Sequence, residues 1–396
     1  MVDRRDAAES LLRPVAALLA ALAWGLAPVA PAADDDPECL RLEVRRDGES
    51  TTLEGRVVLA AVDGGVLVEL ADQRYELLQP DEIAGREPLD SLALPETPRD
   101  LGLRVLAELP PGFDVLVTKH YVVCFDTSRD YARWCVSLFE RLHDAFANYW
   151  EKAGLELAAA DRPLVVVIFS SRADYEQHAA ADLGDAAGRV VGYYNLLSNR
   201  VTTFDLTGSD ALARGGRPPG RAALEALASP EAAGMVSTLV HEATHQMAFN
   251  SGMHRRLAAV PLWVSEGVAT YFETPDLRSQ KGWRGIGGVN RPRLEQVLGN
   301  VRNGMLADIV GGDDAFRNPD TALDAYARAW ALTSFLVATR KDQFVDYLRT
   351  IAAKPPLAED DAATRTAEFE AAFGQPPEAF EDDVLRHLDR LAAKRP

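Results

Sequence analysis

Residues 236–246 read VSTLVHEATHQ, and this segment sets both the architecture and the chemistry that we expect. It contains the pattern His-Glu-x-x-His at His241, Glu242 and His245. On a helix, residues four apart lie about 40° from each other around the axis, so both imidazoles project from one side and can bind one metal ion. Glu242 is turned by about 100° from His241, which brings its carboxylate near a water on the metal rather than near the metal itself. The segment therefore predicts a metal-binding helix.

A second segment, PLWVSEGVATYFE at residues 261–273, offers a third ligand. Two histidines do not complete a catalytic zinc site, which usually has three protein ligands and a water. The segment is short and mostly apolar, and a charged residue on the inner side of such a helix is costly unless it is paired or bound to a metal. We expect Glu266 to be that ligand, with Glu273 on nearly the same helix face.

Together the two segments resemble the gluzincin zinc metallopeptidases. Within them the chain looks most similar to the peptidase MA-like proteins of bacteria, which include a secreted group known only as a domain of unknown function. The motifs that carry the resemblance lie in residues 230–275, and a weaker similarity of layout covers residues 115–385. The resemblance implies that His241, His245 and Glu266 bind one Zn²⁺ per chain and that Glu242 is the general base.

The chain departs from this family at Thr270. In several gluzincins the residue four positions after the glutamate ligand is an Asp that hydrogen-bonds a metal-binding His. Either that partner is missing here, or another residue such as Glu273 supplies it.

The implied reaction is hydrolysis of a peptide bond by a metal-activated water. Zinc lowers the pKa of such a water toward about 7, and Glu242 takes the proton and passes it to the leaving amine. A side-chain donor is expected to stabilise the oxyanion, and Tyr326 is our candidate because many gluzincins resemble this chain in having a Tyr on a later helix. Arg328 and His254 are competitors, and the core-helix spacing of Tyr326 leaves a structural role as the alternative.

A substrate-binding wall is expected just before the motif helix. Residues 199–205 have the pattern of a strand, and Gly192-Tyr193-Tyr194-Asn195 precedes them. In gluzincins an edge strand in this order lines the cleft and pairs with the substrate backbone. We expect residues 192–204 to form this wall, with a purely structural hairpin as the alternative.

The chain divides into four parts. Residues 1–33 have the layout of a secretory signal peptide, with arginines, an apolar run and an Ala-x-Ala site at Ala30-Pro31-Ala32. In residues 38–80, apolar residues alternate with charged ones at a period of two between turn signals. This pattern predicts a small antiparallel β-barrel or sheet. Residues 81–112 are interpreted as a linker. Residues 113–390 are expected to form a gluzincin-like peptidase domain with a mixed sheet and a mostly helical C-terminal half, an α+β protein of zincin-like fold.

Composition narrows the partners and the location. The 396 residues include 60 acidic residues against 42 Lys plus Arg, a formal charge of −18 that repels phosphate backbones and excludes nucleic acid. No stretch after the signal peptide is long and apolar enough to span a membrane, so we expect a secreted or periplasmic protein without stable membrane insertion. A retained N-terminal anchor is the alternative. Cys39, Cys124 and Cys135 cannot form a disulfide framework; one Cys124–Cys135 bridge and three free thiols both stay open.

The function that these features predict is an exported zinc metallopeptidase acting on a peptide or protein. A catalytically silent zincin-fold binding or scaffold protein and a zinc hydrolase of a cell-envelope amide are the alternatives. The intact Glu242 favours an enzyme, because a scaffold has no chemical need for a base beside the ligands. His120, His143, His178 and His387 are isolated in the sequence and are expected to be structural.

Overall fold

The computed structural model describes residues 38–46, 48–160, 162–208, 225–227, 229, 232–274, 283 and 285–393. The signal peptide expected at residues 1–33 lies outside these ranges. Within them, no helix combines the length and the apolar character that crossing a membrane requires.

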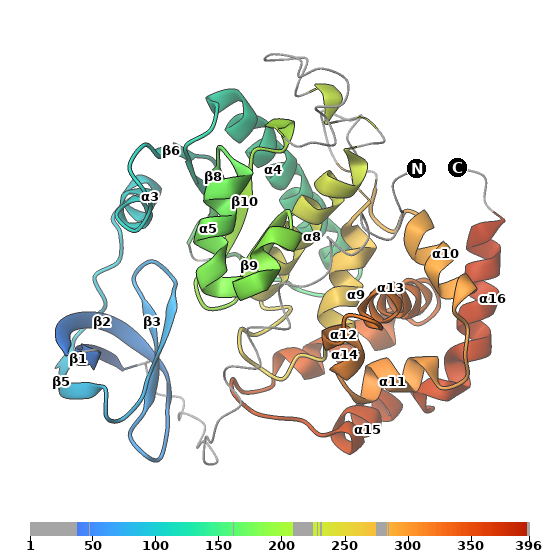
Figure 1. The fold of residues 1–396 in the computed structure, drawn as a ribbon. Coiled ribbons are helices and arrows are strands. Elements are labelled where there is room, and N and C mark those ends of the chain that lie inside the picture. The colour runs from blue at the N-terminus through green and yellow to red at the C-terminus, as the bar shows by residue number, and fades with distance from the viewer. Residues whose placement is uncertain are drawn as a thin grey trace.

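The N-terminal part is an antiparallel sheet of five strands in the order β4-β3-β2-β1-β5. Its strands are β1 (Cys39–Arg46), β2 (Glu49–Ala60), β3 (Val66–Leu70), β4 (Tyr75–Leu78) and β5 (Ile83–Leu89). One sheet face has a small core of its own, and Leu59 and Leu67 join the main core instead. The predicted sheet is thus present, and Figure 1 shows it beside the rest of the molecule.

The linker expected at residues 81–112 is wrong for half of its length. It contains β5, which pairs antiparallel with β1, and the helix α3 (Pro98–Leu106). The strand was missed because it is an edge strand with mostly exposed side chains and no clear alternation. The helix begins at a capping box, in which Thr97 and Asp100 bond each other's backbone N–H.

The second sheet is mixed and has the order β6-β7-β8-β10-β9. Strands β7 (Tyr121–Phe125), β8 (Leu164–Phe169) and β10 (Arg200–Phe204) are parallel, while β6 (Asp114–Val117) and β9 (Gly192–Asn195) pair antiparallel at the two edges. All six residues of β8 are buried, as its continuous apolar run predicts for a central strand. The helices α4 (Arg129–Lys152) and α5 (Arg172–Leu183) are capped by Ser128 and Ser171.

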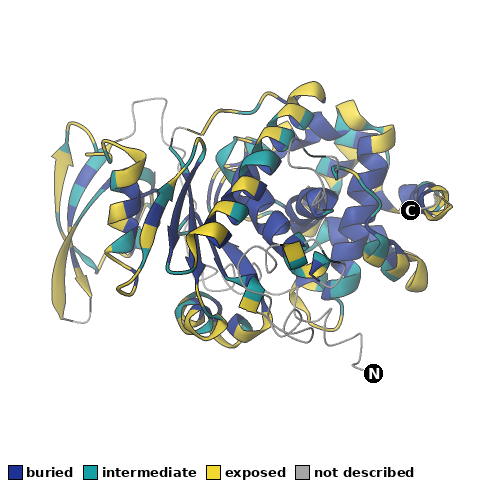
Figure 2. Ribbon diagram, turned by 90° about the horizontal axis from the view of Figure 1, so that it is seen from above, coloured by how far each residue is buried: buried dark blue, intermediate teal, exposed yellow. Residues whose placement is uncertain are grey.

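The C-terminal half is helical. It contains α8 (Ala233–Asn250), α9 (Leu262–Phe272), α10 (Arg291–Gly299), α11 (Met305–Gly311), α12 (Asp314–Arg317), α13 (Ala322–Thr339), α14 (Lys341–Ala352), α15 (Ala362–Phe373) and α16 (Glu381–Ala392). The protein is therefore α+β, with an antiparallel N-terminal sheet and a helical C-terminal half. Figure 2 shows buried ribbon concentrated in the second sheet and the helical half, and more exposed ribbon in the N-terminal sheet.

Close packing of α9 against α13 sets the centre of the helical half. All eleven residues of α9 are buried. A Cβ on Gly267 would lie 2.2 Å from Thr333 Oγ1 and 3.0 Å from the Ala329 carbonyl oxygen, so only glycine fits this crossing. The helix that carries Glu266 is thereby held against the helix that carries Tyr326.

No disulfide joins any two of the three cysteines, all of which lie in the described part of the chain: Cys124 and Cys135 are buried, and Cys39 is half-buried. Burial raises the pKa of Cys124 to about 12 and raises that of Cys135 further, so neither thiol is reactive. The Cys124–Cys135 bridge that the sequence left open is not present, because both side chains are thiols.

Candidate metal centre

The three residues predicted as metal ligands meet at one point between α8 and α9. The Nε2 atoms of His241 and His245 are 3.1 Å apart, and Glu266 Oε2 lies 3.1 Å from the first and 3.3 Å from the second. Helical spacing brings the two imidazoles together, and the packing of α9 on α8 adds the carboxylate. The motif helix α8 begins at Ala233, so both histidines lie well inside it.

The donor set fits a metal cation. One ligand atom from each of His241, His245 and Glu266 lies within 4.8 Å of the others. Glu266 is fully buried, and its Oε1 has no hydrogen-bond partner among the described residues. A buried carboxylate with an unpartnered oxygen is costly, and a cation removes that cost. This group could therefore bind a metal, while the geometry alone does not identify the ion.

The charges of His241 and Glu266 depend on each other. Burial opposes the charged form of His241, but its hydrogen bonds to Glu266 and Glu273 outweigh it and raise the pKa to about 10. Burial likewise opposes ionisation of Glu266, yet the two imidazoles lower its pKa to about 2. A metal ion entering the site thus meets an ionised carboxylate and must displace a proton from His241.

Glu273 is the hydrogen-bond partner of His241 that the sequence left uncertain. Its Oε2 accepts from His241 Nδ1–H at 3.1 Å, which leaves Nε2 facing the site. Asn290 Nδ2 and Arg293 Nε donate to Glu273 Oε1 at 2.6 and 3.1 Å. Thr270, four residues after Glu266, instead donates to the carbonyl of Glu266 within its own helix. Glu273, and not the residue at position 270, is therefore the partner of His241.

Asn290 and Arg293 were missed by sequence reasoning. Asn290 caps α10 by accepting from the Arg293 backbone N–H, and the Asn-Arg-Pro sequence at its start is a recognisable helix signal. That signal predicts the helix α10 but not its contact with Glu273, because residues 274–289 separate Glu273 from α10 along the chain.

Glu242 lies beside the ligands and is held by the edge strand of the second sheet. Its Oε2 accepts the backbone N–H of Tyr194 on β9 at 2.8 Å, and its side chain is buried. Burial raises the pKa of Glu242 above the ordinary glutamate value. The expected wall of residues 192–204 therefore contains β9 and β10 and touches the candidate base directly.

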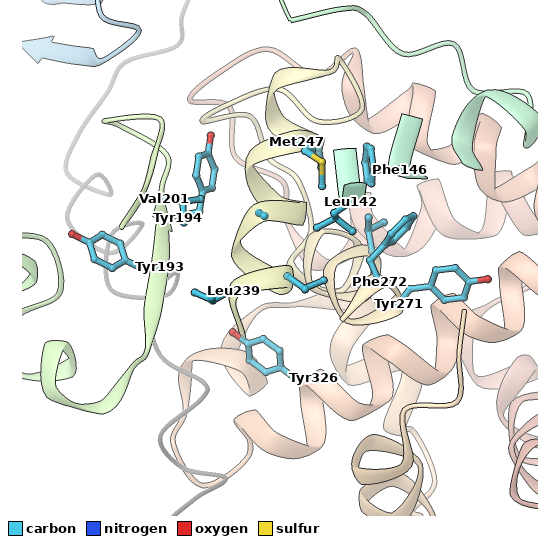
Figure 3. Packing of buried hydrophobic residues seen from close by; sticks show 14 of the residues in the cluster. Leu142, Phe146, Tyr193, Tyr194, Val201, Leu239, Met247, Tyr271, Phe272 and Tyr326 are labelled. Atoms are coloured by element: carbon cyan, nitrogen blue, oxygen red, sulfur yellow. The ribbon is translucent and has the colours of Figure 1, made fainter. Parts of the chain in front are cut away.

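Tyr326 lies on α13 next to the ligands. Its ring centroid is 6.4 Å from that of His241, and the guanidinium of Arg293 lies 5.6 Å from its ring centroid. In Figure 3 the Tyr326 hydroxyl points toward α8. Burial, with the nearby carboxylates of Glu266 and Glu242, raises its pKa well above the ordinary value, so the hydroxyl remains a donor.

The two competitors of Tyr326 have other partners. Arg328 forms an ion pair with Asp324 on its own helix. The Nδ1 of buried His254 is 2.9 Å from the carbonyl oxygen of Met253, and burial lowers the pKa of this imidazole to about 3. Tyr326 has a ring contact with the ligand His241, and the described contacts of Arg328 and His254 include no ring contact with a ligand.

His120 and His143 are not isolated, contrary to the expectation from the sequence. Their rings stack with centroids 3.8 Å apart and 19° between planes, and His120 Nδ1 lies 2.6 Å from Glu140 Oε2. With Asp144 they form a second group of possible ligand atoms. Imidazole lone pairs lie in the ring plane, so those of stacked rings run side by side instead of converging on one ion. His178 packs on Phe169 and His387 bonds Ser334, as structural residues do.

Residues 235–358 match the protein family DUF1570, a family of proteins of unknown function. The match covers less than half of the chain, and it includes the two ligand-bearing helices, α10 and Tyr326. No curated protein matches the sequence. The family match thus singles out the same segment as the site geometry and assigns no activity to it.

Proposed function

We propose that this chain is an exported, gluzincin-type zinc metallopeptidase with a zincin-like peptidase domain. The observation that carries the proposal is the convergence of the Glu266 carboxylate on the paired imidazoles, with Glu242 beside them. A scaffold needs none of this chemistry, whereas hydrolysis needs all of it. The signal-like residues 1–33 support export.

His241, His245 and Glu266 would hold the ion as three protein ligands, the number typical of catalytic zinc. Zinc bound there supplies positive charge that acidifies a water and polarises the scissile carbonyl. Glu273 fixes the ring orientation of His241 through Nδ1, and Arg293 and Asn290 fix Glu273 in turn.

Glu242 is the general base of the proposed reaction. Its raised pKa makes it a better proton acceptor than an ordinary glutamate, so it can take a proton from the attacking water and pass it to the leaving nitrogen. The Tyr326 hydroxyl donates a hydrogen bond to the carbonyl oxygen as negative charge develops there.

The substrate is proposed to lie extended beside β9. This strand ends the second sheet, and its Tyr194 N–H donates to the Glu242 carboxylate on α8, which supports a substrate position along the outer edge of β9. A peptide that adds to this edge brings its own carbonyls toward Glu242.

The test combines metal analysis with a peptide library. We expect about one zinc per chain in the purified mature protein, loss of zinc in Glu266→Ala, and full zinc but no cleavage in Glu242→Gln. Zinc that is retained in Glu266→Ala would remove the proposed ligand set. Equal cleavage by the parent and Glu242→Gln would remove the base. A zinc-loaded parent that cleaves nothing would favour the scaffold alternative.

A further inference from the structure

The turn between β3 and β4 is buried in the rest of the molecule, although turns usually lie in solvent. Ala71, Asp72 and Gln73 are each less than a tenth exposed. Gln73 adopts a positive φ of 75°, which turns the chain at the tip of the hairpin. The hairpin tip of the N-terminal sheet is thus covered by other parts of the molecule, and Gln73 bonds Pro163 and Asn199 there.

Charges on both sides of the tip are paired across the junction. Glu69 forms ion pairs with Arg162 and Arg256, and Asp72 bonds Arg200 at 2.7 Å. The guanidinium of Arg256 also lies 3.6 Å from the ring centroid of Tyr75. Buried acids in the N-terminal sheet matched by arginines elsewhere make this a built interface rather than a loose contact between domains.

At the tip, a network of side-chain amides connects the hairpin to the motif helix. Gln73 Oε1 accepts from Asn199 Nδ2 at 3.1 Å, and Gln73 Nε2 donates to the carbonyl of Pro163 at 2.9 Å. Asn199 lies in the turn between β9 and β10, with φ 59°, and its amide pairs reciprocally with that of Asn250 at 2.7 and 2.8 Å. Gln246, next to His245, donates to the Asn199 carbonyl at 3.0 Å.

The same network reaches Glu242 through Tyr194. The Tyr194 hydroxyl donates to Asn199 Oδ1 at 2.7 Å, and its backbone N–H donates to Glu242 Oε2 at 2.8 Å. In Figure 3, Tyr194 lies on the side of its strand that faces α8, and Tyr193 points away. One residue therefore joins the amide network at one end to the candidate base at the other.

We propose that the hairpin tip of the N-terminal sheet is an internal brace that positions Glu242 through Asn199 and Tyr194. Gln73 and Asn199 are positioning residues in this arrangement, and the N-terminal sheet belongs to the catalytic unit. The inference rests on the proposed function for the role of Glu242, while the brace itself is testable without any substrate.

The experiment uses the full mature chain and three variants. Gln73→Ala removes the tip contact, and Asn199→Gly removes the amide while glycine still accepts the positive φ. Gln79→Ala is the matched control, because Gln79 is an exposed glutamine in the loop directly after β4. For each protein we would measure zinc content, amide exchange of Tyr194 by NMR with isotope-labelled tyrosine, and kcat and KM on a peptide that the parent cleaves.

We expect both brace variants to keep full zinc, to exchange the Tyr194 amide at least about tenfold faster, and to lose about tenfold to a hundredfold in kcat with little change in KM. Gln79→Ala should match the parent in every readout. The brace is refuted if Gln73→Ala and Asn199→Gly exchange and turn over like Gln79→Ala. It is also refuted if they lose zinc, because the network would then support the whole fold and not Glu242. If the zinc-loaded parent cleaves no peptide, the proposed peptidase function fails and the Tyr194 exchange rate alone decides for or against the brace.

Discussion

Replacing Glu273 by Gln should weaken zinc binding while leaving the fold intact. The substitution keeps the size of the side chain and removes the charge that faces His241 Nδ1 at 3.1 Å. Changes to such outer partners of a metal ligand typically cost between about 10- and 100-fold in affinity, or roughly 1.4 to 2.7 kcal/mol. Arg293 lies 3.1 Å from the same carboxylate and neutralises part of its charge, so we expect a loss near the lower end, about tenfold.

The assay is competition for zinc between the protein and a chromophoric chelator. Thr270→Val is the matched control, since Thr270 lies on the same helix as Glu266 and its described side-chain contacts are only to backbone carbonyls of that helix. We expect this control to bind zinc within about twofold of the parent. Unchanged affinity in Glu273→Gln, or an equal loss in Thr270→Val, would refute the assignment of Glu273 as the partner of His241.

Three further outcomes follow from the site and its packing. Zinc affinity should rise about tenfold per pH unit between about pH 6 and 8, because His241, with its pKa raised to about 10, must lose a proton to bind metal. Calorimetry in buffers of different ionisation enthalpy measures the protons released on zinc binding. A release of no proton would contradict this prediction. Tyr326→Phe should lower kcat by about a hundredfold with zinc content unchanged, and an unaltered kcat would exclude Tyr326 as the oxyanion donor. Gly267→Ala should destabilise the protein by about 1–3 kcal/mol in urea, because its Cβ would meet Thr333, whereas Gly234→Ala, which has open space around it, should not.

Local patterns in the sequence explain several elements near the site. The apolar run of β8, the serine caps of α4 and α5, and the helical spacing of His241 and His245 each depend on residues close together in the chain. Glu266 lies beside the imidazoles, where the sequence placed it. The prediction was possible because a buried carboxylate on an apolar helix is costly unless it is paired or bound to a metal.

Contacts between segments far apart in the chain could not be predicted from the sequence. The expectation that Glu273 could replace the missing Asp named the right residue, but Arg293 and Asn290 become visible only when α10 folds back onto α9. The bond from Tyr194 to Glu242 uses a backbone N–H, which every residue but proline has, so no residue type could mark it. The burial of the β3–β4 tip depends on Arg200 and Arg256, both more than a hundred residues away along the chain.

A crystal structure of the zinc-loaded protein, with anomalous diffraction recorded at the zinc absorption edge, tests the proposed centre most directly. We expect a single strong peak between α8 and α9, about 2.0–2.2 Å from Nε2 of His241, Nε2 of His245 and a carboxylate oxygen of Glu266. A peak elsewhere, or a Glu266 carboxylate outside the coordination sphere of the ion, would contradict the proposed metal centre and the chemistry derived from it.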